Sequence, residues 1–142
     1  MSWRIVIGDW ESVRDDAQRL RTEVFVIEQG VPIELEWDES DEVSIHAVVY
    51  GEDNQPIATG RLLPDGHIGR MAVQKALRGL GIGRFLLTSL LDEAQRLGHT
   101  ALVLHAQVSA QGFYALHGFQ PEGAEFMEAG IPHILMRCKL AS

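Results

Sequence analysis

Cysteine is almost absent from the sequence, which contains only Cys138. A single cysteine excludes an internal disulfide, and this usage suits a reducing, cytoplasmic compartment. Long apolar runs are absent too, because no stretch approaches the roughly 18 residues that a membrane span needs. The first ten residues carry Arg4 and Asp9 around a short apolar run, which is not the pattern of a signal peptide. We therefore expect a cytoplasmic protein that does not insert into a membrane.

Basic residues are the scarcer charged class. The chain has 12 Lys and Arg against 20 Asp and Glu, which gives a formal net charge of −8. Proteins that bind the nucleic-acid backbone need a basic face, so we expect no nucleic-acid partner. The acidity is compatible with a cationic substrate such as an amine, although it also serves solubility alone.

The overall composition is that of a globular domain, with 46% hydrophobic and 23% charged residues. A chain of 142 residues is long enough for one domain with a substantial core. Neither an internal repeat nor a low-complexity segment divides it. We predict a single domain over residues 1–142.

Apolar periodicity and turn residues predict alternating strands and helices. The predicted strands are residues 3–9, 44–51, 55–64, 67–73, 100–106, 119–130 and 131–140. The predicted helices are residues 10–29, about 81–97 and 109–118, the last with Ser109 as N-cap. Residues 30–44, which are rich in acids, are predicted to form a loop. This order predicts an α/β fold with one mixed sheet and helices on both faces.

Glycines recur just before the second predicted helix, at Gly79, Gly81 and Gly83, with Arg78 and Arg84 beside them. The segment fits neither a dinucleotide fingerprint nor a Walker loop, because it lacks the last glycine of the first and the lysine of the second. Glycines let backbone N–H groups approach an anion, and a helix N-terminus adds unpaired donors and the positive end of a dipole. The segment predicts a pyrophosphate site, with a tight turn that binds nothing as the alternative.

The stretch from Arg78 to Gly83 (RGLGIG) resembles the [QR]-x-x-G-x-[GA] signature of the GCN5-related N-acetyltransferase (GNAT) family. Residues 112–119 (GFYALHGF) are similar to the second signature of that family. Further short matches between Arg21 and Met136, among them IHAVVY, LHAQ and GIPHILM, resemble its ElaA-type branch. The resemblance implies a GNAT-like acyl-CoA N-acyltransferase fold. Its mostly antiparallel sheet would splay at two central parallel strands, one ending at Val73 and one beginning near Ala101.

The same resemblance implies acetyl-CoA as the acetyl donor. The backbone of Met71, Ala72 and Val73 would pair with the pantetheine arm as an added strand. A backbone N–H of Ala72 or Val73 would polarise the thioester carbonyl. The N–H groups of the glycine segment would hold the pyrophosphate, from residues Gly79, Leu80, Gly81, Ile82, Gly83 and Arg84, with Arg78 adding charge.

Two further cleft residues follow from the resemblance. Tyr114 occupies the position of the family's usual general acid, which protonates the departing CoA thiolate; the alternative is a core aromatic residue. Gln107 lies seven residues before Tyr114, where many members carry an asparagine. Its side-chain amide can make the same contacts with the donor.

The sequence leaves the identity of the general base undecided. An alkylamine is mostly protonated at pH 7, so a base has to free it. Many family members carry a glutamate on the central strand, but residues 67–71 (HIGRM) contain no acid. The candidates are Glu28, His46 and His133, and Glu28 could instead bind a cationic amine. Each of the three also has a purely structural interpretation.

Charged residues in the predicted strands and loop invite other interpretations. Arg61 lies in a strand, where a charge needs a partner, and it is expected to pair with Glu28, Glu36 or Asp38 or to bind an anionic group of the substrate. The acidic stretch 38–43 (DESDEV) lacks the central glycine of an EF-hand, and zinc-like ligand spacing is absent. We predict no metal site. The substrate-contact candidates are Glu28, His46, Arg61 and His133.

Taken together, the residues and the resemblance predict an acetyl-CoA-dependent N-acetyltransferase. It would act on the primary amine of a small molecule by direct attack on the thioester, and family members often form homodimers. One alternative is a non-catalytic acyl-CoA-binding sensor, because the strand glutamate is missing. Another is an acyltransferase that uses a longer acyl donor or a protein amine.

Overall fold

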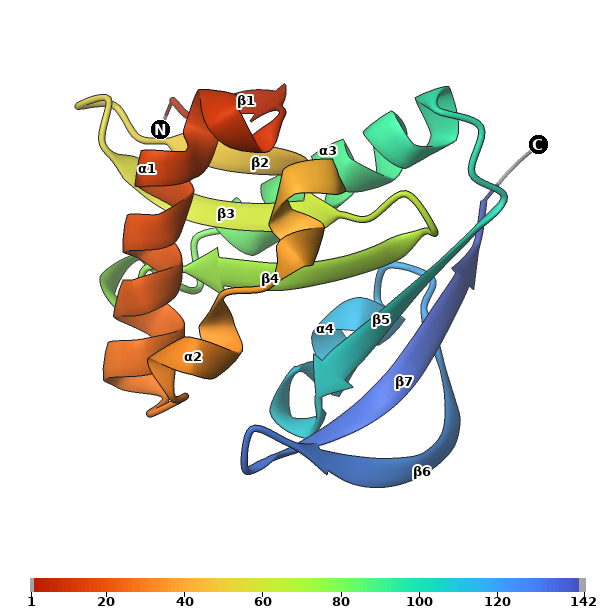
Figure 1. Ribbon diagram of the computed structural model, residues 1–142. Helices are drawn as coiled ribbons and strands as arrows, with labels where there is room; N and C mark the ends of the chain where they lie inside the picture. Colours follow the sequence, from red (N-terminus) through yellow and green to blue (C-terminus); the bar gives the residue numbers. More distant parts are fainter. Residues whose placement is uncertain (1, 141–142) are drawn as a thin grey trace.

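The protein, described here by a computed structural model of residues 2–140, folds around one mixed sheet (Figure 1). Within that range seven strands lie in the order β1-β2-β3-β4-β5-β7-β6. The strands are β1 (Arg4–Gly8), β2 (Ile45–Tyr50), β3 (Pro56–Leu62), β4 (His67–Val73), β5 (Ala101–Gln107), β6 (Gln120–Glu128) and β7 (Ile131–Lys139). The α-helices are α1 (Trp10–Arg21), α2 (Ile33–Glu36), α3 (Ile82–Arg96) and α4 (Gln111–Ala115). The remaining helical turns are η1 (Thr22–Glu28), η2 (Glu39–Val43), η3 (Lys75–Leu77) and η4 (Val108–Ala110).

The sheet consists of two antiparallel halves joined by one parallel pair. β1 to β4 form one half, and β5, β7 and β6 form the other. In the described chain, β4 and β5 are paired at His67 with Val103 and at Ile68 with Leu104, and at no later residue. Beyond Ile68 the two strands diverge, as Figure 1 shows. The predicted splayed, mostly antiparallel sheet is confirmed.

Helices cover both faces of the β1–β4 half. Side chains at successive strand positions point to opposite faces. Val48 of β2 therefore packs with Val13 and Leu20 of α1, whereas its neighbour Ala47 packs in the larger core with Leu86 of α3. The predicted arrangement of helices on both faces is confirmed.

The helix predicted for residues 10–29 forms over nearly that range, but only its first part is an α-helix. It is α-helical only to Arg21 and continues as the π-helical segment η1. The wide turns end with the N–H of Val31 bonded to the carbonyl of Phe25 at 2.8 Å. The sequence does not reveal this change, because a π-helical turn is wider than an α-helical turn but the segment is too short to alter the apolar period noticeably.

Two other local predictions were wrong. The predicted loop 30–44 contains α2 and η2, and Glu36 and Asp41 within them are buried by partners from other elements. The helix predicted from Ser109 starts at Gln111, with Ala110 at the N-cap position. Ser109 lies instead in the short turn η4. For residues 30–44, contacts distant in sequence outweigh local propensity. The helix α4 starts two residues later than predicted because a 3₁₀ turn precedes it.

None of the helices between residues 2 and 140 has the length and apolarity required to cross a bilayer.

Candidate active site

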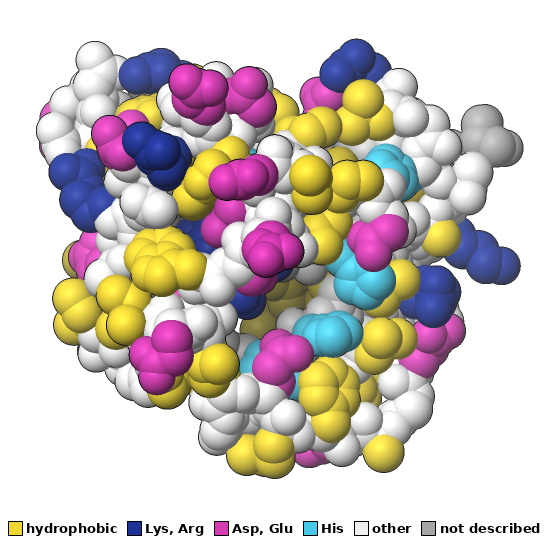
Figure 2. All heavy atoms as spheres, viewed as in Figure 1, with side chains coloured by type: hydrophobic (Ala, Val, Ile, Leu, Met, Phe, Trp, Pro, Cys, Tyr) yellow, Lys and Arg dark blue, Asp and Glu magenta, His cyan; other side chains and the backbone are white. Residues whose placement is uncertain are grey.

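The diverging ends of β4 and β5 open into a cleft of about 1610 Å³. Its walls come from η1, β4, the loop before α3, β5, α4 and β7. Pockets for a single small ligand usually measure roughly 300–1,000 Å³, so this cleft has room for two substrates. Figure 2 shows it as a hollow with histidine and acidic side chains beside it.

The glycine segment forms one end of the cleft. Gly79 and Gly81 have φ values of +84° and +91°, which a residue with a Cβ adopts only with strain. Gly81 is also the N-cap of α3, and within the described residues no side chain caps this N-terminus. Backbone N–H groups at an uncapped helix start are suited to an anion. Ile82, Gly83 and Arg84 line the cleft with them, whereas Leu80 of the same segment is exposed and lies outside the lining.

A bulge in β4 shapes the middle of the cleft. The pairing with β3 shifts by one residue between Ala72 and Gly69, and Arg70 within the bulge has φ of +51°. Bulges redirect side chains next to active sites. Met71, Ala72 and Val73 line the cleft as predicted. Arg70 lines it too, and sequence reasoning missed this residue because no local pattern marks an arginine for a positive φ.

Arg61 belongs to a buried ion network. Its Nη1 donates to Asp38 at 2.8 Å and to Asp41 at 2.9 Å, and its Nη2 donates to Asp38 at 3.0 Å. Of the predicted partners, only Asp38 is correct. Burial works against the charged form of Asp38, but the Arg61 hydrogen bonds hold its pKa below the usual carboxyl range. Arg61 lines the cleft, but its charge is matched by two carboxylates, so a role in binding an anionic substrate is not supported.

The network continues through Arg21 and Arg70. Arg21, only 1% exposed, bonds to Glu36 and lies 2.8 Å from Asp41. Arg70 donates to Asp38 at 3.1 Å and lies 3.8 Å from Glu36. The result is a cluster of balanced charge, the arginines Arg21, Arg61 and Arg70 with the acids Glu36, Asp38 and Asp41.

Glu28 is held by Arg78 at the rim of the cleft. The Nη atoms of Arg78 donate to the two carboxylate oxygens of Glu28 at 2.6 and 2.7 Å, and its Nε donates to the carbonyl of Val73 at 3.0 Å. The Arg78 hydrogen bonds hold the pKa of Glu28 below its usual range. A carboxylate of lowered pKa is a weak base, so the structure argues against Glu28 as the general base.

His46 is not part of the cleft, and its prediction as a base or substrate contact was wrong. The ring is 1% exposed, and it packs 4.6 Å from the ring of Trp10, between centroids. Its Nε2 bonds to the carbonyl oxygen of Asp41 at 2.9 Å. Burial lowers the pKa of His46, so it serves as a neutral core residue.

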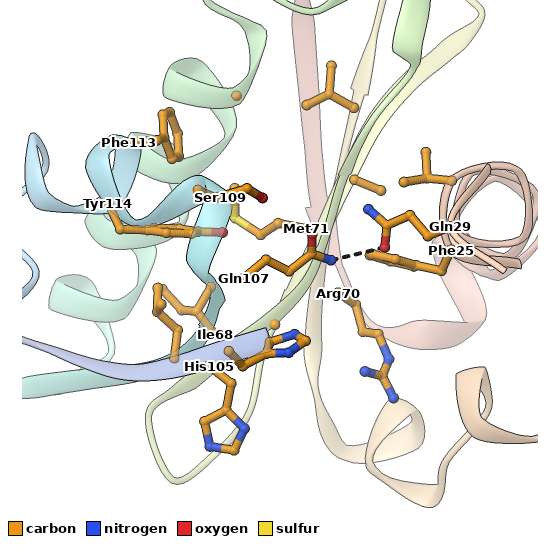
Figure 3. Close-up of a pocket in the computed structure, with 18 of the residues that line it drawn as sticks. Phe25, Gln29, Ile68, Arg70, Met71, His105, Gln107, Ser109, Phe113 and Tyr114 are labelled. Carbon is orange, nitrogen blue, oxygen red and sulfur yellow. Dashed lines mark hydrogen bonds between the residues drawn. The ribbon is translucent and has the colours of Figure 1, made fainter. Parts of the chain in front are cut away.

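Tyr114 lies on α4 with its hydroxyl directed into the cleft toward Met71 (Figure 3). Its ring is held edge-on by Phe113 at 5.1 Å and by Phe119 at 6.0 Å, between ring centroids. Burial raises the pKa of Tyr114 to about 12. The phenol therefore stays protonated at neutral pH, as a proton donor must.

Gln107 reaches across the cleft from the end of β5. Its Nε2 donates to Oε1 of Gln29 at 2.9 Å, the contact marked in Figure 3. Gln107 lines the cleft, and its contact with the donor stays a prediction. Gln29 was missed, because nothing in the sequence links two amides 78 positions apart.

His133 lines the cleft together with His105 and Glu128, two residues that sequence reasoning missed. Glu128 contacts both rings, with Oε1 at 2.9 Å from Nδ1 of His105 and Oε2 at 3.5 Å from Nε2 of His133. The sequence does contain a signal for His105, because strand alternation places it on the same face as Gln107. The sequence contains no signal that would have identified Glu128.

Within residues 2–140, no group of three or more His, Cys, Asp or Glu side chains is arranged to hold a metal ion. The absence of a metal site stays a prediction.

Comparisons with known proteins agree with this geometry. Residues 13–140 match the acetyltransferase (GNAT) domain family. The uncharacterized N-acetyltransferase YjcF of Bacillus subtilis is 39% identical over 137 residues, covering 94% of this chain and 97% of its own.

Solved structures of similar fold also include N-acyltransferases. An acyl-CoA N-acyltransferase from Pseudomonas aeruginosa superposes with a TM-score of 0.85 at 33% identity, over 96% of this chain and 99% of that one. Escherichia coli ElaA superposes with a TM-score of 0.86 at 28% identity, over 97% and 100%. The chain belongs to the GNAT acetyltransferase family, in its ElaA-type branch, and is an acetyltransferase.

Proposed function

We propose that this enzyme transfers the acetyl group of acetyl-CoA to the primary amine of a small molecule, by direct attack of the amine on the thioester. The family uses acetyl-CoA as donor and acts on amines. The observation that carries the proposal is the cleft between the diverging ends of β4 and β5, because the glycine segment, the β4 bulge and Tyr114 all line it.

The donor fits along β4. Past Ile68 the β4 backbone is free of the ladder with β5, so the extended pantetheine arm can add to it as a strand would. The pyrophosphate lies at the start of α3, on the N–H groups of the glycine segment. This places the thioester near Ala72 and Val73, whose N–H groups polarise its carbonyl. Much of the rate then comes from positioning.

Tyr114 acts on the leaving group. Because its hydroxyl is protonated at neutral pH and points toward Met71 of β4, it can donate its proton as the C–S bond breaks. Positioned acids contribute roughly 10²–10⁴-fold to rate.

Substitution of Tyr114 by phenylalanine tests this role. We expect Tyr114→Phe to lower thiol release at least about 100-fold with an unchanged Kd for acetyl-CoA. The matched control is Tyr50→Phe, because Tyr50 lies on β2 and bonds to Asp16 at 2.5 Å, outside the cleft. Unchanged turnover in Tyr114→Phe would reject the assignment.

The same assay separates the alternative functions. A sensor would bind acetyl-CoA and release no thiol with any amine. Faster turnover with longer acyl-CoA donors would identify an acyltransferase of different donor preference. Acetylation of peptide N-termini in preference to small amines would identify a protein substrate.

A homodimer stays a prediction of the resemblance. Sedimentation velocity at micromolar concentration measures the mass directly. A single species at the 15.8 kDa of one chain would reject the homodimer.

A further inference from the structure

Glu128 joins two imidazoles on the β5–β7 wall of the cleft. His105 comes from β5, Glu128 from the end of β6 and His133 from the start of β7. The two contacts of Glu128, 2.9 Å to His105 and 3.5 Å to His133, use different carboxylate oxygens. The side chains of His105 and Glu128 are 38% and 45% exposed, so a substrate in the cleft can reach them.

The hydrogen bonds set different proton positions on the two rings. Nδ1 of His133 lies 2.7 Å from the carbonyl oxygen of Ile131, which only accepts, so this nitrogen carries a proton. In His105 the Nδ1–H donates to Glu128. The neutral ring of His105 therefore has its lone pair on Nε2, and this atom can accept a proton.

His105 also occupies a distinctive place in the sheet. The ladder between β4 and β5 ends at Ile68 and Leu104, and His105 is the next residue of β5. Its neighbours Leu104 and Ala106 are buried in the core, so His105 and Gln107 point to the opposite face. In Figure 3 Tyr114 lies above Gln107 and His105 lies below it. Tyr114, the proposed acid, and His105 therefore lie on either side of the point where β4 and β5 diverge.

We propose that His105 is the general base that takes the proton from the acceptor ammonium, with Glu128 as its positioning residue. This inference rests on the proposed function. The other candidates are less suited, because Arg78 holds Glu28 and His46 lies in the core. His133 is only 7% exposed and its Nε2 faces Glu128 at 3.5 Å, so this nitrogen is less accessible to an acceptor than Nε2 of His105. A carboxylate beside an imidazole fixes its tautomer and stabilises the imidazolium that forms.

The step balances as follows. The ammonium gives one proton to Nε2 of His105, and the free amine nitrogen bonds to the thioester carbon. The C–S bond breaks, and the CoA thiolate takes the proton of the Tyr114 hydroxyl. The nitrogen loses its second proton, which restores Tyr114 through water, and the imidazolium of His105 releases its proton to solvent.

Other ionisable groups face His105 and contribute to any pH profile. His67 of β4 lies edge-on at 6.0 Å between ring centroids and is itself bonded to Asp65 at 3.0 Å. From β6 and β7 the charged neighbours are Glu128 and His133. Arg70 of β4 lines the same cleft. Variants therefore have to be compared over a pH range, not at one pH.

The test measures thiol release by His105→Gln with acetyl-CoA and a primary alkylamine, from pH 6.5 to 9.5. We expect turnover at pH 7 to fall about 100-fold with an unchanged Kd for acetyl-CoA. The loss should shrink toward pH 9.5, because free amine then forms in solution without a base. A merely structural effect would lower turnover equally at every pH.

Two further variants sharpen the result. Glu128→Gln should lower turnover at pH 7, because a neutral amide holds the protonated His105 ring less well than a carboxylate does, and the loss should again shrink toward pH 9.5. His99→Gln, a histidine outside the cleft, is the matched control and should stay within twofold of wild type.

Turnover of His105→Gln within twofold of wild type at pH 7 would overturn the assignment, as would a loss independent of pH. A pH-dependent loss in His133→Gln alone would also overturn it and would name His133 as the base. Wild-type protein that binds acetyl-CoA but releases no thiol would instead overturn the proposed function and the assignment with it.

Discussion

At the scale of single residues, the pair of Glu28 and Arg78 places a carboxylate beside the expected pyrophosphate site. Arg78 is the first residue of the family signature, yet its guanidinium is engaged by Glu28 through two hydrogen bonds. Both side chains are partly exposed, at 25% for Glu28 and 41% for Arg78, so the pair contributes little to stability. Its larger effect is expected to be on anion binding.

Glu28→Gln should tighten acetyl-CoA binding about threefold to tenfold, because a negative charge is removed from the vicinity of a diphosphate. Titration calorimetry at low and high salt measures this, and salt should reduce the gain. Because Arg78 holds the pKa of Glu28 below its usual range, the ion pair persists above about pH 4.5 and is lost as pH falls through the lowered pKa. The gain should therefore be constant from pH 6 to 9.

Glu23→Gln is the matched control for that experiment. Glu23 lies on the same segment η1 and contacts Gln74, outside the cleft lining. Weaker acetyl-CoA binding by Glu28→Gln would mean that the pair positions Arg78 for the ligand instead of competing with it.

At the scale of secondary-structure elements, the buried ion network fixes α2 and η2 against α1. Arg21, the last residue of α1, bonds to Glu36 of α2 and to Asp41 of η2. Those two acids are 2% and 3% exposed. Burial raises the pKa of Glu36 above the usual carboxyl range despite the nearby Arg21. The segment predicted as a solvated loop is thus ordered by one buried arginine.

Arg21→Ala should lower the free energy of unfolding by about 3–5 kcal/mol, because it leaves the three carboxylates of the buried cluster with only Arg61 and Arg70 as counter-charges. Urea denaturation followed by circular dichroism measures the change. Arg14→Ala provides the comparison, since Arg14 is 55% exposed and pairs with an exposed aspartate. Its substitution should cost less than about 1 kcal/mol. Equal costs for the two variants would contradict the structural role of the network.

At the scale of the whole molecule, the splayed sheet should couple donor binding to stability. Acetyl-CoA is expected to bridge the β1–β4 half and the β5–β7 half. At about 100 times its Kd, a ligand that binds only the folded state adds about 2.7 kcal/mol. Thermal unfolding should therefore shift upward with acetyl-CoA and with CoA, and not with NAD. The absence of a shift with either CoA species would reject the donor site.

The residues of the donor end could be predicted from the sequence because they are local. The segment from Arg78 to Arg84 sets its own backbone conformation through Gly79 and Gly81, whose φ values are positive. The same segment contains Gly81, the N-cap of α3, and the first residues of that helix. The apolar stripe of α3 and the apolar run of residues 100–106 are equally local, so the order of strands and helices and the mixed sheet followed from such patterns.

The acceptor end was decided by tertiary structure alone. Glu128 meets His105 across 23 positions of sequence, and Arg61 meets Asp38 across 23. Such contacts depend on strand register and on the bulge at Arg70, which no short pattern encodes. By itself the sequence determined the fold, the glycine segment and the position of Tyr114. Only the tertiary structure assigned Glu28 to Arg78, His46 to the core and Glu128 to His105, because the partners of a side chain are set by the packing of distant segments.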